Sequence, residues 1–273
     1  MEILFVSAIL LYMLSAAGYC AYLFLQHERL QQAGGVLLIG GFICQTVVLG
    51  GAFAITGQVP VNNLHETLSV AAWTLVGVFL ALRTRFNLKI LGVYTAPLAA
   101  FVLLAATQFP REPLQPENLL KGVWLFTHIL TIFIGDAAFV LAAGVGMLYL
   151  IQERNIKAKT RDFFFKRLPS LDLLDTTGYA CIVTGFTMLT IGLITGMIYA
   201  KIIWGRFWQW DAKEVWSAVT WIFYAVLLHE RLAVGWRGRR AAIMAIVGVG
   251  VLLFTFLGVN FLLSGHHGQF TRW

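Results

Sequence analysis

Five tryptophans surround an Asp-Ala-Lys-Glu core in one short stretch of this chain, WGRFWQWDAKEVWSAVTW from Trp204 to Trp221. Indole rings prefer the headgroup level of a membrane, which explains one or two tryptophans at an interface. That preference does not explain a cluster of them beside Asp211, Lys213 and Glu214 in a single connection. The stretch therefore predicts a flat aromatic surface that binds a flat, apolar ligand.

Three histidines flank this aromatic stretch along the chain. His128 follows Trp124 by one turn in WLFTHILTIF, where an imidazole is costly unless it has a partner or a task. His266 and His267 follow the last apolar segment, where a solvated polar tail is the plainer interpretation. Two imidazoles over a bed of indoles suit haem, whose iron takes axial histidines and whose ring faces favour aromatic contacts. A zinc site would need three or four close ligands and would give the aromatic rings no purpose.

The remaining histidines and one acid have weaker claims. His229 follows Glu214 by fifteen residues, roughly 22 Å along a helix, which places it at the opposite end of its span. It is either a snorkelling interfacial residue or a second haem ligand, and His27 in the same leaflet could be its opposite ligand. His65 begins a helix, where capping chemistry accounts for it. Asp136 is the one carboxylate expected deep in a span, and it is a functional candidate for that reason.

The elements that must position these residues are membrane helices, since 59% of the residues are hydrophobic and only 12% are charged. Eight apolar runs each approach the ~20 residues that a helix needs to cross the hydrocarbon core. We expect an all-α, polytopic helix bundle that forms a single membrane domain, 1–273, in contact with membrane lipid. The eight runs lie near 3–25, 34–56, 66–82, 91–107, 124–150, 177–200, 214–232 and 240–264.

The distribution of Lys and Arg predicts the orientation, because fourteen fall on one side of the membrane and six on the other. The positive-inside rule places the richer side in the bacterial cytoplasm, so both termini and the Trp-rich loop 201–216 face the periplasm. The net charge of +7 follows from this bias, and no nucleic-acid partner is needed to explain it. The basic cytoplasmic loop 151–176 ends in LPSLDLLDTTGY, which predicts a short interfacial helix. There we expect Asp172 and Asp175 to be caps or dipole partners rather than a site.

These stretches resemble the tryptophan-rich WWD signature and the last helix of the cytochrome c assembly superfamily, and within it the eight-span CcsA (ResC) branch of System II. The similarity covers roughly residues 59 to 268 and includes PVNNLHETLSVAAW, LPSLDLLD and FTFLGVNFLLSGHHG. Three positions depart from the family pattern. Ala212 stands where proline is common, His65 where tyrosine is usual, and Asp136 where tyrosine is frequent. The last two suggest an altered pocket or a divergent paralogue.

The resemblance implies a protein that receives haem b from the cytoplasmic side, carries it across the membrane and presents it on the WWD surface. There the haem would be joined by thioether bonds to the CxxCH motif of an apocytochrome c. His128 and His267 would be the outer axial ligands, with His266 as a substitute, and His229 would match the histidine of an inner haem site. The second inner histidine would come from a CcsB (ResB) membrane partner, with which the chain would form a holocytochrome c synthase.

By the same resemblance, six residues of the WWD loop would form the haem-binding surface. They are Trp204, Trp208, Trp210, Asp211, Lys213 and Trp216. The indoles would turn the vinyl edge toward the thiols, Lys213 would meet a propionate, and Asp211 would either orient the propionates or cap the helix.

No catalytic side chain is implied, and two alternatives stay open: a HemX-like membrane regulator of haem biosynthesis and a CcmC-like donor that passes haem to a chaperone. The full WWD loop with both outer histidines favours the synthase, and the six-span plan of the donor argues against it.

Overall fold

The computed structural model describes residues 1–86, 88–110, 122–159, 163 and 167–259. Within these residues every regular element is a helix, and eight helices are long and apolar enough to cross a membrane. The predicted all-α, eight-span class is therefore confirmed, and the chain is a multi-pass membrane protein. The structure divides into two compact units, and the single membrane domain stays a prediction. Unit 1 comprises Met1–Glu112 with Arg154–Ser170, and unit 2 comprises Pro113–Glu153 with Leu171–Trp273.

Unit 1 is built from four membrane helices, and several of their buried polar groups pair with one another. Tyr12 donates its hydroxyl hydrogen to Oε1 of Gln45 at 2.7 Å, and Gln45 Nε2 donates to the Ser69 carbonyl at 2.8 Å. A chain of this kind is required because no water reaches the hydrocarbon core to pair with such groups. The elements are α1 (Glu2–Leu25), α2 (Glu28–Thr56), α3 (Leu64–Phe86), the 3₁₀ turn η1 (Lys89–Leu91) and α4 (Gly92–Ala106).

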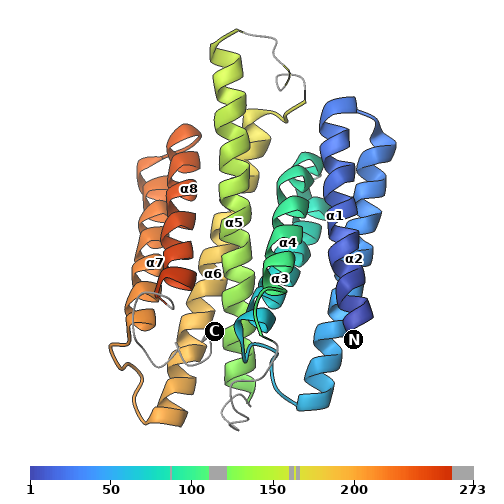
Figure 1. Ribbon diagram of the computed structural model, residues 1–273. Coiled ribbons are helices and arrows are strands. Elements are labelled where there is room, and N and C mark those ends of the chain that lie inside the picture. The colour runs from blue at the N-terminus through green and yellow to red at the C-terminus, as the bar shows by residue number, and fades with distance from the viewer. Residues whose placement is uncertain (87, 111–121, 160–162, 164–166, 260–273) are drawn as a thin grey trace. The chain divides into compact units, whose positions relative to one another are not determined.

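Unit 2 contains the other four spans, which run alternately in opposite directions (Figure 1). The amino ends of α5 and α7 therefore lie at the same end of the unit as the carboxyl ends of α6 and α8. We call this the Trp-loop end, after residues 204–211, and the opposite one the Arg231 end. The elements are α5 (Val123–Lys157), α6 (Leu171–Trp204), α7 (Ala212–His229), the π turn η3 (Glu230–Val234), α8 (Arg239–Leu253) and the π turn η4 (Phe254–Gly258).

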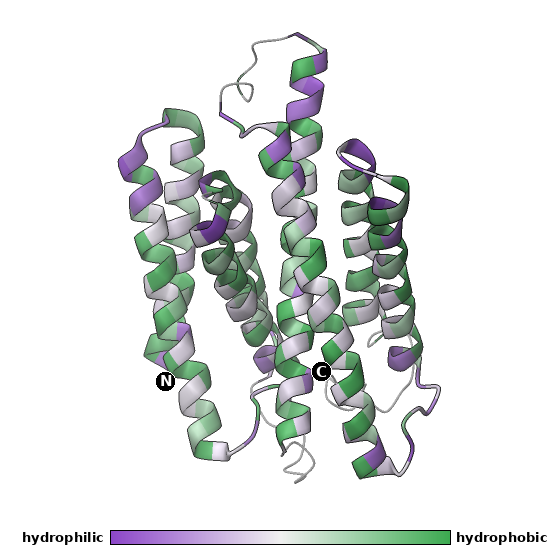
Figure 2. Ribbon diagram, turned by 180° about the vertical axis from the view of Figure 1, so that it is seen from behind, coloured by the Kyte–Doolittle hydropathy of each residue, from purple (hydrophilic) through white to green (hydrophobic). Residues whose placement is uncertain are grey.

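Several helices extend beyond the apolar runs that predicted them. α5 continues to Lys157 in the basic connection, and α6 begins at Leu171 rather than near 177. The leucines after Pro169 are thus the first turns of α6, where the sequence predicted a separate interfacial helix. Figure 2 shows the reason, because the helices are hydrophobic along their middles and carry hydrophilic residues at their upper ends, where the connection between α5 and α6 lies. Hydropathy marks only the part in hydrocarbon, whereas helix propagation is cooperative and continues past it.

Small residues allow the helices of unit 2 to approach closely. A Cβ atom on Gly146 of α5 would lie 2.8 Å from the carbonyl oxygen of Ala242 in α8, so no larger residue fits there. Two turns nearer the amino end of α5, Phe139 stacks on Tyr224 of α7 with ring centroids 3.5 Å apart. Close backbone contact of this kind replaces the hydrophobic driving force that helices lack inside a bilayer.

Candidate functional site

The amino end of α7 is fixed by a capping box. The carboxylate of Asp211 accepts the backbone N–H of Lys213 at 3.2 Å, and Oε2 of Glu214 accepts the N–H of Asp211 at 3.3 Å. These bonds satisfy donors that the first turn of a helix otherwise leaves unpaired. The Asp-Ala-Lys-Glu core is therefore a helix start, and of the two roles considered for Asp211, capping is the one that the structure shows.

The same glutamate controls the backbone on both sides of Trp210. Oε2 of Glu214 also accepts the N–H of Gln209 at 2.8 Å, so it receives one donor before Trp210 and one after it. Trp210 adopts φ 60°, a left-handed conformation that bulky residues rarely take. Its side chain is 80% exposed. Strain of this kind persists only where the surroundings impose it. No role was predicted for Glu214 from the sequence, although its D-x-x-E spacing from Asp211 is a capping signal.

The remaining tryptophans of the loop divide into two groups. Trp208 meets Trp210 edge to face with ring centroids 6.0 Å apart. The buried Nε1 of Trp208 has no hydrogen-bond partner among the described residues. Trp204 ends α6 with 38% of its surface exposed, whereas Trp216 packs on Phe254 of η4 at 4.5 Å. The structure therefore brings Trp208 and Trp210 together as a pair and uses Trp216 in a helix contact.

Lys213 lies in the first turn of α7, within electrostatic range of Asp211 and of Asp136 in α5. A cation in that range favours the ionised form of an acid in a membrane span, which hydrocarbon otherwise disfavours. Nothing in the spacing of Asp136 and Lys213 along the sequence indicates this proximity.

His128 is held against α6 by a hydrogen bond that fixes its tautomer. Nδ1 of His128 lies 2.7 Å from the carbonyl oxygen of Gly192. A carbonyl oxygen only accepts, so Nδ1 carries the hydrogen, and in the neutral imidazole Nε2 carries the lone pair. Donation from one ring nitrogen to a backbone carbonyl is the usual way in which proteins orient a histidine that binds a metal.

The imidazole fits because α6 has no side chain beneath it. A Cβ atom on Gly196 would lie 2.6 Å from Nδ1 of His128, well inside contact distance. Gly196 thus leaves room for the ring, and Gly192, one turn earlier in α6, supplies its acceptor. Neither glycine was predicted from the sequence, although their G-x-x-x-G spacing is a known signal for close helix packing.

Two histidines of unit 1 have structural positions. His65 lies in the first turn of α3, buried against Phe5 at a ring-centroid distance of 4.9 Å. Its Nδ1 donates to the carbonyl oxygen of Ala106 at 2.8 Å, which joins α3 to the end of α4. His27 is the N-cap residue of α2 and makes no side-chain capping bond.

The other candidate ligands lie elsewhere. His229 is the last residue of α7, exposed at the Arg231 end, whereas His128 is in the second turn of α5, whose amino end is at the Trp-loop end. His266 and His267 lie outside the described residues, so their place relative to His128 stays a prediction. The described residues hold no group of three or more His, Cys, Asp or Glu side chains that could bind a metal ion.

Comparison with known proteins identifies the family. The model of the cytochrome C assembly protein family matches residues 61–267, which is most of the chain. The chain belongs to the cytochrome c assembly family. The cytochrome c biogenesis protein CcsA of Synechococcus elongatus is 31% identical over 270 residues, covering 82% of this chain and 83% of that protein.

Two further CcsA proteins show the same relationship. That of Guillardia theta is 32% identical over 243 residues, covering 81% of this chain and 80% of its own length. That of Chlamydomonas reinhardtii is 36% identical over 221 residues, covering 78% and 61% respectively. This cytochrome c assembly protein is therefore of the CcsA type, as the WWD stretch predicted, and its role lies in cytochrome c biogenesis.

Proposed function

We propose that this chain is the haem-handling subunit of a System II cytochrome c synthase in the bacterial cytoplasmic membrane. It accepts haem b at the Arg231 end, on the cytoplasmic side, and presents it at the Trp-loop end, which faces the periplasm. A CcsB (ResB) protein completes the synthase, and the acceptor is the CxxCH segment of an apocytochrome c. His128 and His267, or His266 in its place, are the axial ligands of the outer haem.

The observation that carries this proposal is the bond from Nδ1 of His128 to the carbonyl of Gly192. A neutral imidazole that donates from Nδ1 has its lone pair on Nε2. This is the protonation state that an iron ligand needs. The ring lies where Gly196 has no side chain and where the Gly192 carbonyl accepts its hydrogen, so its position is built rather than incidental. His128 lies in the second turn of α5, whose amino end is at the Trp-loop end of the unit.

The Trp loop supports the same proposal through two features. The strained backbone of Trp210 exposes its ring, although an apolar side chain gains nothing from solvent. Nε1 of Trp208 is a buried donor with no acceptor among the described residues. A bound carboxylate such as a haem propionate supplies an acceptor, and the ring faces supply the contacts that a porphyrin favours.

The chemistry asked of these residues is positioning. Each thioether forms when a cysteine thiol adds across a vinyl double bond, so that sulfur joins one carbon and the thiol hydrogen ends on the other. The addition involves no net oxidation or reduction. Orientation alone is worth several kcal/mol in such a step, because it replaces a collision of two molecules by a reaction within one complex. The aromatic surface fixes the ring plane, and the axial histidine fixes the iron.

The direct test is co-expression with a CcsB-type partner and a CxxCH reporter in a host without its own maturation system. We expect haem that stays on the reporter through denaturation, visible by peroxidase staining, only when both membrane proteins are present. A reporter whose two cysteines are replaced by alanine is the control. No covalent haem, together with no haem in the purified complex, contradicts the proposal. A HemX-like regulator would instead alter the amount of the first enzyme of haem synthesis, and a CcmC-like donor would load a chaperone.

Trp210→Gly separates the surface from the fold. Glycine adopts positive φ freely, so the change relieves about 1–2 kcal/mol of left-handed strain while it removes the indole. We expect the midpoint of thermal unfolding to stay the same or rise, while haem retained at the outer site falls. Trp210→Ala is the matched control, since it should lose the haem equally without the gain in stability. Lower stability with full haem retention in Trp210→Gly would contradict this role.

A further inference from the structure

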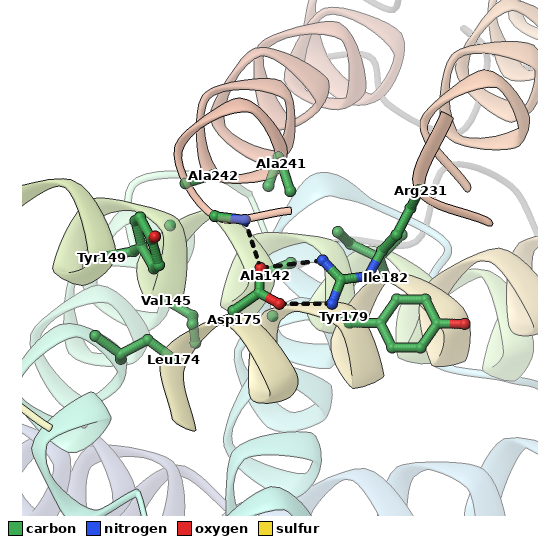
Figure 3. Close-up of a pocket in the computed structure, with 14 residues that line it drawn as sticks. Ala142, Val145, Tyr149, Leu174, Asp175, Tyr179, Ile182, Arg231, Ala241 and Ala242 are labelled. Atoms are coloured by element: carbon green, nitrogen blue, oxygen red, sulfur yellow. Dashed lines mark hydrogen bonds and ion pairs between the residues drawn. The ribbon is translucent and has the colours of Figure 1, made fainter. Parts of the chain in front are cut away.

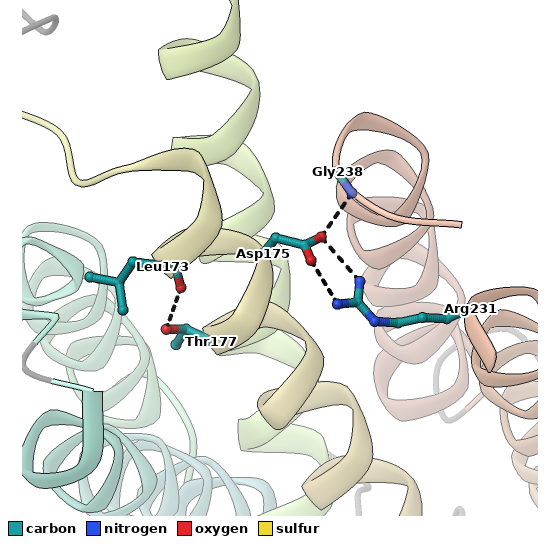
Figure 4. Close-up of polar contacts among 5 residues, drawn as sticks. All are labelled: Leu173, Asp175, Thr177, Arg231 and Gly238. Carbon is teal, nitrogen blue, oxygen red and sulfur yellow. Dashed lines mark hydrogen bonds and ion pairs between the residues drawn. The ribbon is translucent and has the colours of Figure 1, made fainter. Parts of the chain in front are cut away.

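A charged cluster joins three helices at the Arg231 end of unit 2 (Figure 4). The carboxylate of Asp175 in α6 receives both terminal nitrogens of Arg231, Nη1 to Oδ1 at 3.0 Å and Nη2 to Oδ2 at 2.6 Å. Oδ1 also accepts the backbone N–H of Gly238, the N-cap of α8, at 2.8 Å. Asp175 therefore holds both ends of the connection between α7 and α8, whereas the sequence predicted only a cap or dipole partner.

The cluster is built into the protein rather than placed on its surface. The side chains of Arg231 and Asp175 are 10% and 16% exposed, and the guanidinium lies 4.4 Å from the ring centroid of Tyr179. Gly238 has φ 64°, and a Cβ atom there would lie 2.5 Å from the hydroxyl of Tyr149. Two-point recognition of a carboxylate by arginine fixes direction as well as distance.

The cavity beside the ion pair is too small to be a ligand site. Half of its lining residues are alanine or glycine, among them Ala142, Gly146, Gly178 and Ala242 (Figure 3). Its volume is about 20 Å³, and one water molecule needs roughly 10–15 Å³ by the same measure. No haem or lipid fits there. The effect of the cluster must therefore be on the protein segments that it holds in place.

The ion pair of Asp175 and Arg231 holds the turn that follows His229. Arg231 is the second residue of the π turn η3, two positions after His229. Neighbouring helical residues are turned by about 100°, so two positions place side chains on nearly opposite faces. With Arg231 tied to α6, His229 must point away from α6, and it is in fact exposed.

We infer that Asp175, acting through Arg231, is the positioning residue that keeps the His229 side chain on the exposed surface of unit 2. There a second iron ligand from another element can meet the same haem. The inference rests on the proposed function, because it gives His229 an inner haem to bind. A buried ion pair is weak evidence for stability, since desolvation offsets much of its attraction, and its best-attested use is to fix one geometry among several. The π turn supports this role, because such turns are common at functional sites.

The test measures the position of residue 229 without haem. In a background in which the three native cysteines are replaced, spin labels are placed at His229→Cys and at Ile191→Cys, an exposed position on α6. We expect one narrow distance distribution in the parent, and a broad one in Asp175→Asn and Arg231→Gln. Loss of a charge-assisted hydrogen bond should raise the population of molecules in which the η3 turn has left α6 by about tenfold or more. Glu153→Gln is the matched control, since its ion pair with Arg239 at 3.9 Å lies at the same end, and the arginine of that pair is 62% exposed.

A second measurement links this position to haem. In the complex with the CcsB-type partner, Asp175→Asn should weaken the low-spin haem spectrum of the inner site as His229→Ala does, and Glu153→Gln should not. A distance distribution that stays narrow in both Asp175→Asn and Arg231→Gln overturns the inference, whatever the haem spectrum. If the parent complex binds no haem, the proposed function fails, and the spin-label distances still decide whether Asp175 positions residue 229.

Discussion

Replacing His128 by alanine is expected to abolish the outer haem site while the helices stay intact. The imidazole is an axial ligand in the proposed site, and even groups that only orient metal ligands are worth about 10–100-fold in affinity. The haem bound per purified complex should therefore fall by at least that factor, and covalent haem on a CxxCH reporter should fall with it. Absorption spectra of the oxidised and reduced complex measure the first quantity, and peroxidase staining of the reporter measures the second.

Two controls separate ligand loss from damage to α5. Thr127→Val changes the neighbouring residue, whose hydroxyl only bonds back to the Val123 carbonyl of its own helix at 2.8 Å. This variant should keep the haem spectrum. Added imidazole should restore a low-spin spectrum to His128→Ala, because a free ligand can enter the space that the side chain vacated. Full haem retention in His128→Ala without added imidazole would show that another residue binds the iron.

The spans of this protein could be predicted because hydropathy is averaged over twenty residues and tolerates local errors. The helix ends could not, since α6 begins at Leu171 in sequence that is no longer apolar enough to signal a span. The Trp loop could also be predicted as a binding surface, because a preference for the membrane interface does not account for five tryptophans beside an Asp-Ala-Lys-Glu core.

The groups that support this site were less visible for a common reason. Gly192 acts through a carbonyl oxygen and Gly196 through the absence of a side chain, so neither carries chemistry that a sequence displays. Asp175 and Arg231 are ordinary charged residues in basic connections, and only the fold shows that they meet. Glu214 differs, because its spacing from Asp211 was a readable capping signal whose second effect, on the backbone of Trp210, needed coordinates.

Gly196→Ala is expected to remove outer haem binding almost as fully as loss of the histidine itself. The added methyl would lie 2.6 Å from Nδ1 of His128, so the imidazole must move and its bond to the Gly192 carbonyl must break. Overpacking of this kind costs about 1–3 kcal/mol where the neighbour cannot yield. The freed ring also loses its fixed tautomer, and the haem bound per complex should fall by about 10–100-fold.

Two other glycines show whether the room left for the ring at Gly196, rather than glycine in a helix, is what matters. Gly250 of α8 has open space around its Cβ position, so Gly250→Ala should leave the haem unchanged and stabilise the helix by about 0.5–1 kcal/mol. At Gly192 the new methyl would meet the flexible end of Ile132, and the carbonyl that accepts from His128 would remain. Gly192→Ala should therefore weaken haem binding less than Gly196→Ala. Equal losses in all three variants would mean that backbone flexibility, and not the seat of the imidazole, governs the site.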